Sequence, residues 1–164
     1  MAAPAAARVL VAGIGNVFCT DDGFGPEVAR RLAGLSWPDG VRVVDYGIRG
    51  LHLSYDLVDP WDTVVLVDAV PDRGAVGTVA LVEILADDGG HAAIDAHGMD
   101  PATVLATLAA LGGRLPERTL LVGCQVADTG EGMGLTPPVA AAVPVAVETV
   151  RAVVAGNRRP TEVG

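Results

Sequence analysis

Apolar residues in this chain gather into five short runs that predict buried strands. Each run is rich in valine, leucine or isoleucine and holds few polar positions, which is the pattern of a strand covered on both faces. The runs lie at residues 8–13, 41–45, 63–69, 77–84 and 119–123. The run at 63–69 is the clearest, and we expect the run at 77–84 at an edge of the sheet.

Stretches with helical signals separate these runs. Pro26 suits the first position of a helix over residues 25–32, and Glu27 in its first turn complements the helix dipole. Further helices are predicted over residues 51–58, from the Asp100-Pro101 cap to residue 111, and from Thr136 to about residue 155. Pro144 falls inside the last helix and is expected to kink or split it, because its nitrogen has no hydrogen to donate.

Strands that alternate with helices at this spacing predict the α/β class. We expect a three-layer α/β/α domain with a twisted, mainly parallel sheet of about five strands between helices. One domain is predicted over residues 1–164, with 1–7 and 157–164 flexible. Sites in such sheets form beyond the carboxyl ends of the strands, where strand order reverses. If the first and third strands are neighbours, the loops that follow them open into one crevice.

Charge and composition limit the partners. The net charge of −9, with eleven arginines and no lysine, disfavours nucleic acid, which needs a basic face. The two cysteines, Cys19 and Cys124, form no CxxC pair, so neither a disulfide framework nor a thiol-rich zinc site is expected. The apolar stretches look too short to cross a bilayer, and the start of the chain has no basic segment typical of a secretion signal. We therefore expect a cytoplasmic protein, without a membrane partner, and a monomer.

The glycines after the first strand suggest a nucleotide site only weakly. Gly13 and Gly15 match the first two glycines of a dinucleotide-binding fingerprint, and Asp45 stands where the ribose-binding acid would lie. The third glycine is missing, because residue 18 is Phe18. The alternative is that these glycines only let the chain turn sharply over the edge of the sheet.

Acidic residues lie at the ends of the first and third strands. Asp21 and Asp22 belong to the loop after the first strand, where helix capping is the simpler explanation. Asp68 ends the apolar run of a strand expected at the centre of the sheet, where a charge is costly to bury without a partner. A capping role and a functional role both remain open for Asp68.

Three histidines are candidates for chemistry. His52 falls in a predicted helix and His91 in a polar loop, so both are expected to be structural or surface residues. His97 lies in a connection that can reach the crevice. Joined to Asp22 and Asp68, it gives a mixed nitrogen and oxygen donor set that suits zinc or nickel. A pairing of Cys19 with His97 as nucleophile and base is the less favoured alternative.

Six short motifs, taken in order, resemble those of the hydrogenase maturation proteases. They are GIGN (13–16), DDGFG (21–25), DYG (45–47), VDA (67–69), HG (97–98) and GLTP (134–137). The resemblance extends from residue 8 to about residue 155. Each motif is short, but their order and spacing together are specific.

This resemblance implies a single α/β/α domain and a defined activity. Members of the family cleave a C-terminal extension from the precursor of the large subunit of a [NiFe]-hydrogenase, after nickel has been inserted. The family positions thought to contact nickel fall here on Asp22, Asp68 and His97. The resemblance thus implies an aspartyl-type peptidase with Asp22 and Asp68 as catalytic residues, and nickel as the metal.

Two mechanisms are compatible with these residues. In the first, which we favour, nickel arrives inside the substrate, and Asp22, Asp68 and His97 complete its coordination, so that only loaded precursors align for cleavage. In the second, a metal bound to the enzyme activates the attacking water. A non-proteolytic nucleotide- or metal-binding module on the same sheet is the alternative function.

Overall fold

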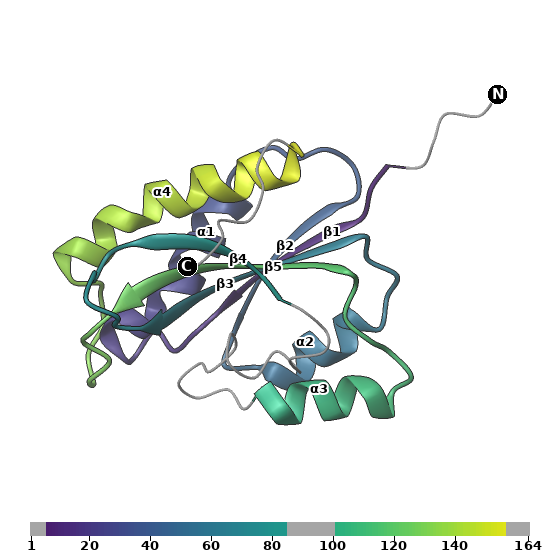
Figure 1. Ribbon diagram of the computed structural model, residues 1–164, viewed down its shortest axis with the longest axis horizontal. Coiled ribbons are helices and arrows are strands. Elements are labelled where there is room, and N and C mark those ends of the chain that lie inside the picture. Colours follow the sequence, from purple (N-terminus) through teal and green to yellow (C-terminus); the bar gives the residue numbers. More distant parts are fainter. Residues whose placement is uncertain (1–5, 85–100, 157–164) are drawn as a thin grey trace.

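The chain folds around one five-stranded sheet between two layers of helices (Figure 1). The computed structural model describes residues 6–84 and 101–156, with side chains of 101–103 left aside. The strands are β1 (Val9–Ile14), β2 (Val41–Gly47), β3 (Thr63–Pro71), β4 (Val79–Glu83) and β5 (Arg118–Val126). Their order across the sheet is β2-β1-β3-β5-β4, with every neighbouring pair parallel except β4 and β5. The predicted α/β class and mainly parallel sheet are confirmed.

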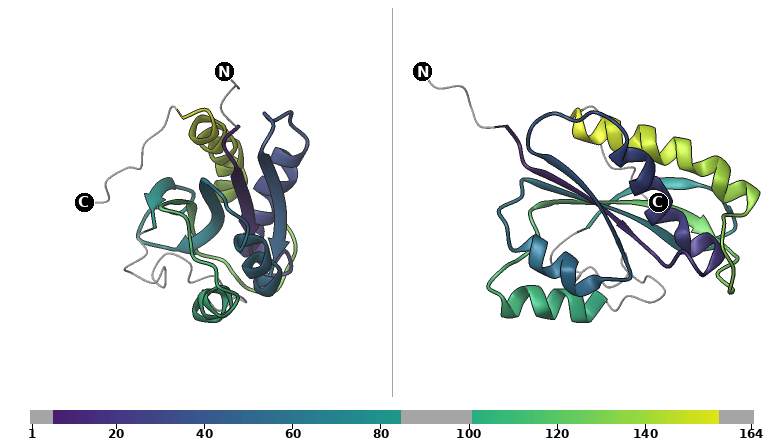
Figure 2. Two further views of the ribbon diagram at one scale, coloured as in Figure 1. Left: turned by 90° about the vertical axis from the view of Figure 1, so that its right-hand side faces the viewer. Right: turned by 180° about the vertical axis from the view of Figure 1, so that it is seen from behind.

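Two helices cover each face of the sheet. The helices are α1 (Phe24–Ala33), α2 (Gly50–Leu57), α3 (Pro101–Ala110) and α4 (Pro137–Val154), and a short 3-10 helix, η1 (Thr20–Gly23), precedes α1. Helices α1 and α4 pack together on one face, and α2 and α3 pack together on the other (Figure 2). Each layer therefore encloses its own apolar core against the sheet.

Alternation of side chains along the strands supplies both cores. On β1, Val9 and Val11 point towards α1 and α4, whereas Leu10, Ala12 and Ile14 point towards α2 and α3. Successive side chains of a strand leave opposite faces, so an unbroken apolar run is what a doubly covered strand requires. This explains why the runs read from the sequence contain so few polar positions.

Several element boundaries differ from the predicted ones. Helix α1 begins at Phe24, so Pro26 is its third residue. The missing N–H of proline is harmless there, because the N–H groups of the first turn have no acceptor within the helix. Strand β3 continues to Pro71, so Asp68 lies within the strand and not at its end. Helix α4 is not split at Pro144, because buried residues on both sides of the proline hold it against the core.

Helix α4 also corrects the expectation that every apolar stretch is too short to cross a bilayer. Over Pro137–Val154 it is long and apolar enough to span one by length and composition. Its buried residues, including Val139, Val143 and Val150, pack in the core shared with α1 and the sheet. In this fold one face of α4 is buried against the sheet and α1.

Strand order reverses between β1 and β3. The chain leaves β1, adds β2 on one side of it and then returns to add β3 on the other side. The predicted neighbourhood of the first and third strands is therefore confirmed. Loops after these strands diverge at their carboxyl ends, which is where a crevice forms in sheets of this type.

Candidate functional site

The loop after β1 folds back over the sheet because three glycines allow unusually close backbone contacts. Gly25 lies directly on the ends of β1 and β3: a Cβ added to it would be 2.1 Å from the Ile14 carbonyl oxygen and 2.4 Å from that of Val67. A Cβ on Gly13 would be 2.6 Å from the Cβ of Ala29. Only glycine permits this approach, so the start of α1 is pressed against the sheet at these two strands.

The same packing explains the glycines that imitate a nucleotide fingerprint. A Cβ on Gly15, whose φ is +146°, would lie 1.9 Å from the carbonyl oxygen of Asp22. The first residues of α1, Phe24, Gly25 and Pro26, are buried, and proline has no N–H to offer. A phosphate needs exposed N–H groups at a helix start, whereas this helix starts with three buried residues, one of them a proline. The geometry favours the sharp-turn interpretation over nucleotide binding.

Asp22 is fixed in η1 at this edge of the sheet. Its side chain is buried, and its Oδ2 accepts a hydrogen bond of 2.9 Å from the backbone N–H of Asn16. Its own N–H donates to the Cys19 carbonyl oxygen at 3.0 Å. The 13–16 motif thus orients the carboxylate through its backbone.

Asp68 is buried in the central strand, with 1% of its surface exposed. Its register partner on β5 is Gly123, and the pairing of β1 with β3 ends one residue earlier, at Gly13 and Val67. Asp68 therefore lies just past the point where β1 leaves β3, on the face of the sheet that carries Leu66. Helix η1 contacts β3, so Asp22 and Asp68 belong to adjoining elements at one edge of the sheet.

The Asp21 side chain contacts a different part of the fold from the Asp22 side chain, and the sequence did not predict this difference. Its Oδ1 accepts a 2.7 Å hydrogen bond from the N–H of Thr136, and its Oδ2 accepts one of 2.8 Å from the Thr136 hydroxyl. Thr136 is the residue that caps α4. The GLTP motif (134–137) is therefore the partner of Asp21, and this carboxylate anchors α4 to the η1 loop.

The third predicted ligand, His97, lies outside the described residues, as do His91, the Asp100 cap and the tail 157–164. Within 6–84 and 101–156, no cluster of three histidine, cysteine or acidic side chains is placed to hold a metal. The ligand set of two carboxylates and one imidazole stays a prediction. His52 is exposed on α2, in agreement with its expected surface role.

The Asp45 side chain belongs to a turn. Its Oδ1 accepts a 2.9 Å hydrogen bond from the N–H of Gly47, whose φ of +55° favours glycine. The Arg49 guanidinium donates to the Asp45 carbonyl oxygen at 2.5 Å. The turn at the end of β2 thus uses Asp45 locally, which further weakens its interpretation as a ribose-binding acid.

The two cysteines are free and differ in environment. Cys19 is half-buried in the loop before η1, and Cys124 is fully buried on β5. Burial, with the negative charge of Asp21 nearby, raises the pKa of Cys124 to about 11. Cys124 is therefore a neutral core thiol at physiological pH, and thiolates rather than thiols are nucleophilic. The pairing of Cys19 with His97 stays untested, since His97 is outside the described residues.

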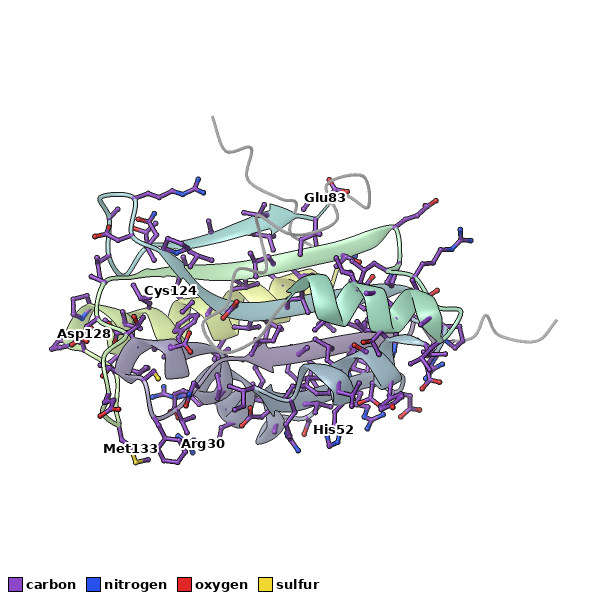
Figure 3. The ribbon with its side chains drawn as sticks, turned by 90° about the horizontal axis from the view of Figure 1, so that it is seen from below. Arg30, His52, Glu83, Cys124, Asp128 and Met133 are labelled. Carbon is purple, nitrogen blue, oxygen red and sulfur yellow. The ribbon has the colours of Figure 1, made fainter. Side chains whose placement is uncertain are left out.

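A cavity of about 490 Å³ opens beside the η1 loop. Its lining comes from the β1–η1 loop, η1, α1, Asp45 of β2, and α4 with the segment that leads into it. Val17, Thr20, Glu27, Arg30, Met133 and Leu135 are among the lining residues. Figure 3 shows Arg30 and Met133 at the same end of the molecule as Asp128. Thr20 and Gly23 of η1 line the cavity, so it borders the element that carries Asp22, although neither Asp22 nor Asp68 is among its lining residues.

Known proteins resemble this chain over most of its length. A family model described as "Hydrogenase maturation protease" matches residues 26–153. The hydrogenase 2 maturation protease of Escherichia coli is 33% identical over 151 residues, covering 88% of this chain and 89% of that protein. The hydrogenase expression/formation protein HupD of Rhizobium leguminosarum is 35% identical over 153 residues, covering 89% and 73%.

The fold is also similar to that of a solved structure. The hydrogenase maturating endopeptidase HybD from E. coli superposes with a TM-score of 0.78 at 29% sequence identity. The match covers 91% of this chain and 93% of that one. The similarity therefore includes the whole sheet and both helix layers.

Proposed function

This chain belongs to the hydrogenase maturation protease family and is a peptidase, and we propose that it cleaves the large-subunit precursor of a [NiFe]-hydrogenase. The proposed reaction removes a C-terminal extension after nickel has been inserted. The observation that supports it most directly is the pair of buried carboxylates, Asp22 and Asp68, on adjoining elements at the switch point of the sheet. Buried acids at such a position are typical of functional sites in sheets of this type.

Nickel enters this proposal as part of the substrate. Carboxylate oxygens and an imidazole nitrogen are donors that nickel accepts. Asp22 and Asp68 would supply the oxygens and His97 the nitrogen, so that a precursor carrying nickel is held at this edge of the sheet. A precursor without nickel lacks that attachment, and its scissile bond is not aligned.

The hydrolytic step requires a general base. As water attacks the carbonyl carbon of the scissile bond, Asp22 or Asp68 accepts its proton, and the departing amine takes up a proton as the C–N bond breaks. The hydrogen bond from Asn16 holds the Asp22 carboxylate in one orientation during this step. We place this enzyme in the cytoplasm, as a monomer that meets its substrate transiently.

The test is to mix the enzyme with nickel-loaded and nickel-free precursor and to weigh the products by mass spectrometry. The enzyme is first treated with a chelator that is then removed, so that any nickel comes from the substrate. We expect mass loss from the loaded precursor only. An intact loaded precursor would exclude this function, and cleavage that needs nickel added back to the enzyme would favour metal-assisted hydrolysis instead.

Substitution of the buried acid in β3 tests the assignment of the site. Asp68→Asn keeps the shape of the side chain but removes its charge, so we expect a folded protein that no longer processes the loaded precursor. His97→Ala is expected to behave in the same way. His52→Ala is the matched control, because His52 is exposed on α2 and should leave processing unchanged. Normal processing by Asp68→Asn would remove Asp68 from the site.

A further inference from the structure

We propose that Phe18 and Met133 form a docking surface for the stretch of precursor polypeptide that flanks the scissile bond. The inference rests on the proposed function and adds where, and through which contacts, the substrate chain is held. Its occupant is an extended peptide segment with at least one large apolar side chain. The argument comes from the exposure, the fixation and the position of these two residues.

The first observation is exposure. Phe18 is 64% exposed and Met133 is 74% exposed, more than any other large apolar side chain in the part of the chain that the structure describes. Val17, beside Phe18, is 40% exposed as well. Neighbouring apolar side chains in contact with water are unfavourable and are typical of surfaces that a partner covers.

The second observation is that the backbone holds these side chains outwards. The N–H of Gly132 donates to the Phe18 carbonyl oxygen at 2.9 Å, and the N–H of Thr20 donates to the Gly132 carbonyl oxygen at 2.8 Å. The Thr20 hydroxyl adds a 2.8 Å hydrogen bond to the carbonyl oxygen of Gly130. Phe18 and Met133 thus come from distant parts of the sequence but lie on two loops joined by hydrogen bonds.

The backbone at this junction is strained. Thr20 has a φ of +49°, the left-handed region that a β-branched residue rarely adopts, and it alone does so among the described residues other than glycine. Such a conformation persists only where surrounding contacts enforce it, and it is concentrated at functional sites. The loop is therefore held in one shape, which presents Phe18 at little further cost in conformational entropy.

The third observation is continuity with the site. Phe18 lies two residues before η1, the element that carries Asp22, and Thr20 and Met133 both line the cavity of about 490 Å³ beside it. A peptide bound over Phe18 and Met133 therefore lies beside η1. Docking beside this element gives the scissile bond the positioning that hydrolysis requires.

One wall of the cavity is apolar. Met133 and Leu135, in the segment before α4, lie on that wall. On the α1 side Glu27 is paired with Arg30 at 2.7 Å and with Arg31 at 3.3 Å, so two arginines share one carboxylate. A large apolar side chain of the substrate gains contact area on the apolar wall.

The experiment is steady-state cleavage of nickel-loaded precursor by the full-length Phe18→Ala, Met133→Ala and double variants. Val145→Ala is the matched control, since Val145 is 53% exposed on α4. We expect KM to rise about tenfold or more in the double variant, with kcat within about twofold of wild type, because peptide binding loses two apolar contacts. Thermal unfolding should be unchanged, because both side chains are exposed.

Conservative replacement distinguishes contact from shape. The Phe18→Leu and Met133→Leu variants keep an apolar side chain and should restore KM to near the wild-type value. Unchanged KM in the double alanine variant, or the same rise in Val145→Ala, would overturn the docking surface while cleavage by the wild type leaves the proposed function intact. Failure of the wild type to cleave loaded precursor would instead overturn the proposed function itself.

Discussion

Two adjacent aspartates of η1 have separate roles. Asp21 binds Thr136 at the start of α4, while Asp22 binds the backbone of Asn16 at the end of β1. Successive residues of a tight turn point in different directions, so identical neighbours in sequence can face different parts of the fold. The structure therefore gives Asp21 an architectural role, and Asp22 keeps the catalytic role proposed for it above.

This division predicts opposite phenotypes for neighbouring substitutions. Asp21→Ala removes the acceptor of the Thr136 N–H and hydroxyl, and we expect it to lower the free energy of unfolding by about 2–3 kcal/mol. Asp22→Asn retains an oxygen for Asn16, so stability should change by less than about 1 kcal/mol while cleavage of loaded precursor is lost. Urea unfolding and the mass assay measure the two effects. Equal stability losses would show that both acids are structural.

A double-mutant cycle tests whether Asp21 acts through the Thr136 hydroxyl. If the two side chains interact as the 2.8 Å hydrogen bond indicates, Asp21→Ala and Thr136→Val should not be additive. Strict additivity would mean that Asp21 stabilises the fold without this hydroxyl, through the Thr136 N–H or another contact.

The site was only partly predictable from single residues. Asp68 stands out because it interrupts an apolar strand, a signal that any reader of the sequence can find. Asp22 could not be separated from Asp21, since the distinguishing partner of Asp21 lies 115 residues away. Phe18 entered the sequence argument only as a missing glycine, because exposure of a large apolar side chain cannot be read from its neighbours in the chain.

At the scale of elements, the contact of α1 with the sheet depends on glycine. The GIGN motif and Gly25 form complementary halves of one interface, in which helix and strand backbones touch with almost no side chain between them. A dinucleotide fingerprint uses glycines for a similar close approach, so the two patterns look alike in sequence. In a dinucleotide site the close approach brings the backbone to the pyrophosphate, whereas here the start of α1 packs directly on β1 and β3.

Gly25→Ala tests this interface. Its added methyl group would meet two carbonyl oxygens of β1 and β3 at less than 2.5 Å, so we expect a loss of about 3 kcal/mol or more in unfolding free energy. Gly34→Ala is the matched control, because its nearest neighbour would be 3.5 Å away and its φ of −81° suits alanine. Thermal or urea unfolding of both variants measures the difference, and equal stabilities would contradict the close-packed interface.

Local sequence patterns located the strands and helices well but did not predict which strands pair with each other. In the part of the chain that the structure describes, the strands occur where the apolar runs predicted them, and α1 to α4 occur where the capping and proline signals did. The antiparallel direction of β4 follows from its short link to β3, over residues 72–78, which has no room for a crossover helix. Its pairing with β5 in place of β3 depends on a strand that comes later in the chain, and no local pattern contains that information.

At the scale of the whole molecule, buried ionisable groups determine how the fold responds to alkali. Burial and a hydrogen bond to Asp56 raise the pKa of Tyr46, and burial raises that of Cys124 from about 9 to about 11. Each group is held neutral in the folded protein at a pH at which it would ionise in the unfolded chain. Both therefore favour unfolding as the pH rises above the ordinary pKa of the group.

The Cys124 thiol affects the free energy of unfolding over a defined pH range. Below pH 9 its contribution to stability is complete, and between about 9 and 11 it is lost as only the unfolded chain ionises, by up to roughly 2–3 kcal/mol. We expect the unfolding free energy of the wild type to fall more steeply over this range than that of Cys124→Ala. Urea unfolding at a series of pH values compares the slopes, and equal slopes would show that Cys124 does not contribute.

The bond between Asp21 and Thr136 has a consequence for biosynthesis. It joins the first loop of the fold to the cap of its last helix, and α4 supplies much of the core on that face of the sheet. A nascent chain that has emerged only as far as β5 lacks Thr136, the donor to the Asp21 carboxylate, and leaves that face of the sheet uncovered. On the proposed function, the η1 segment therefore reaches its final shape only when α4 docks, and each newly made molecule becomes competent for cleavage late in its folding.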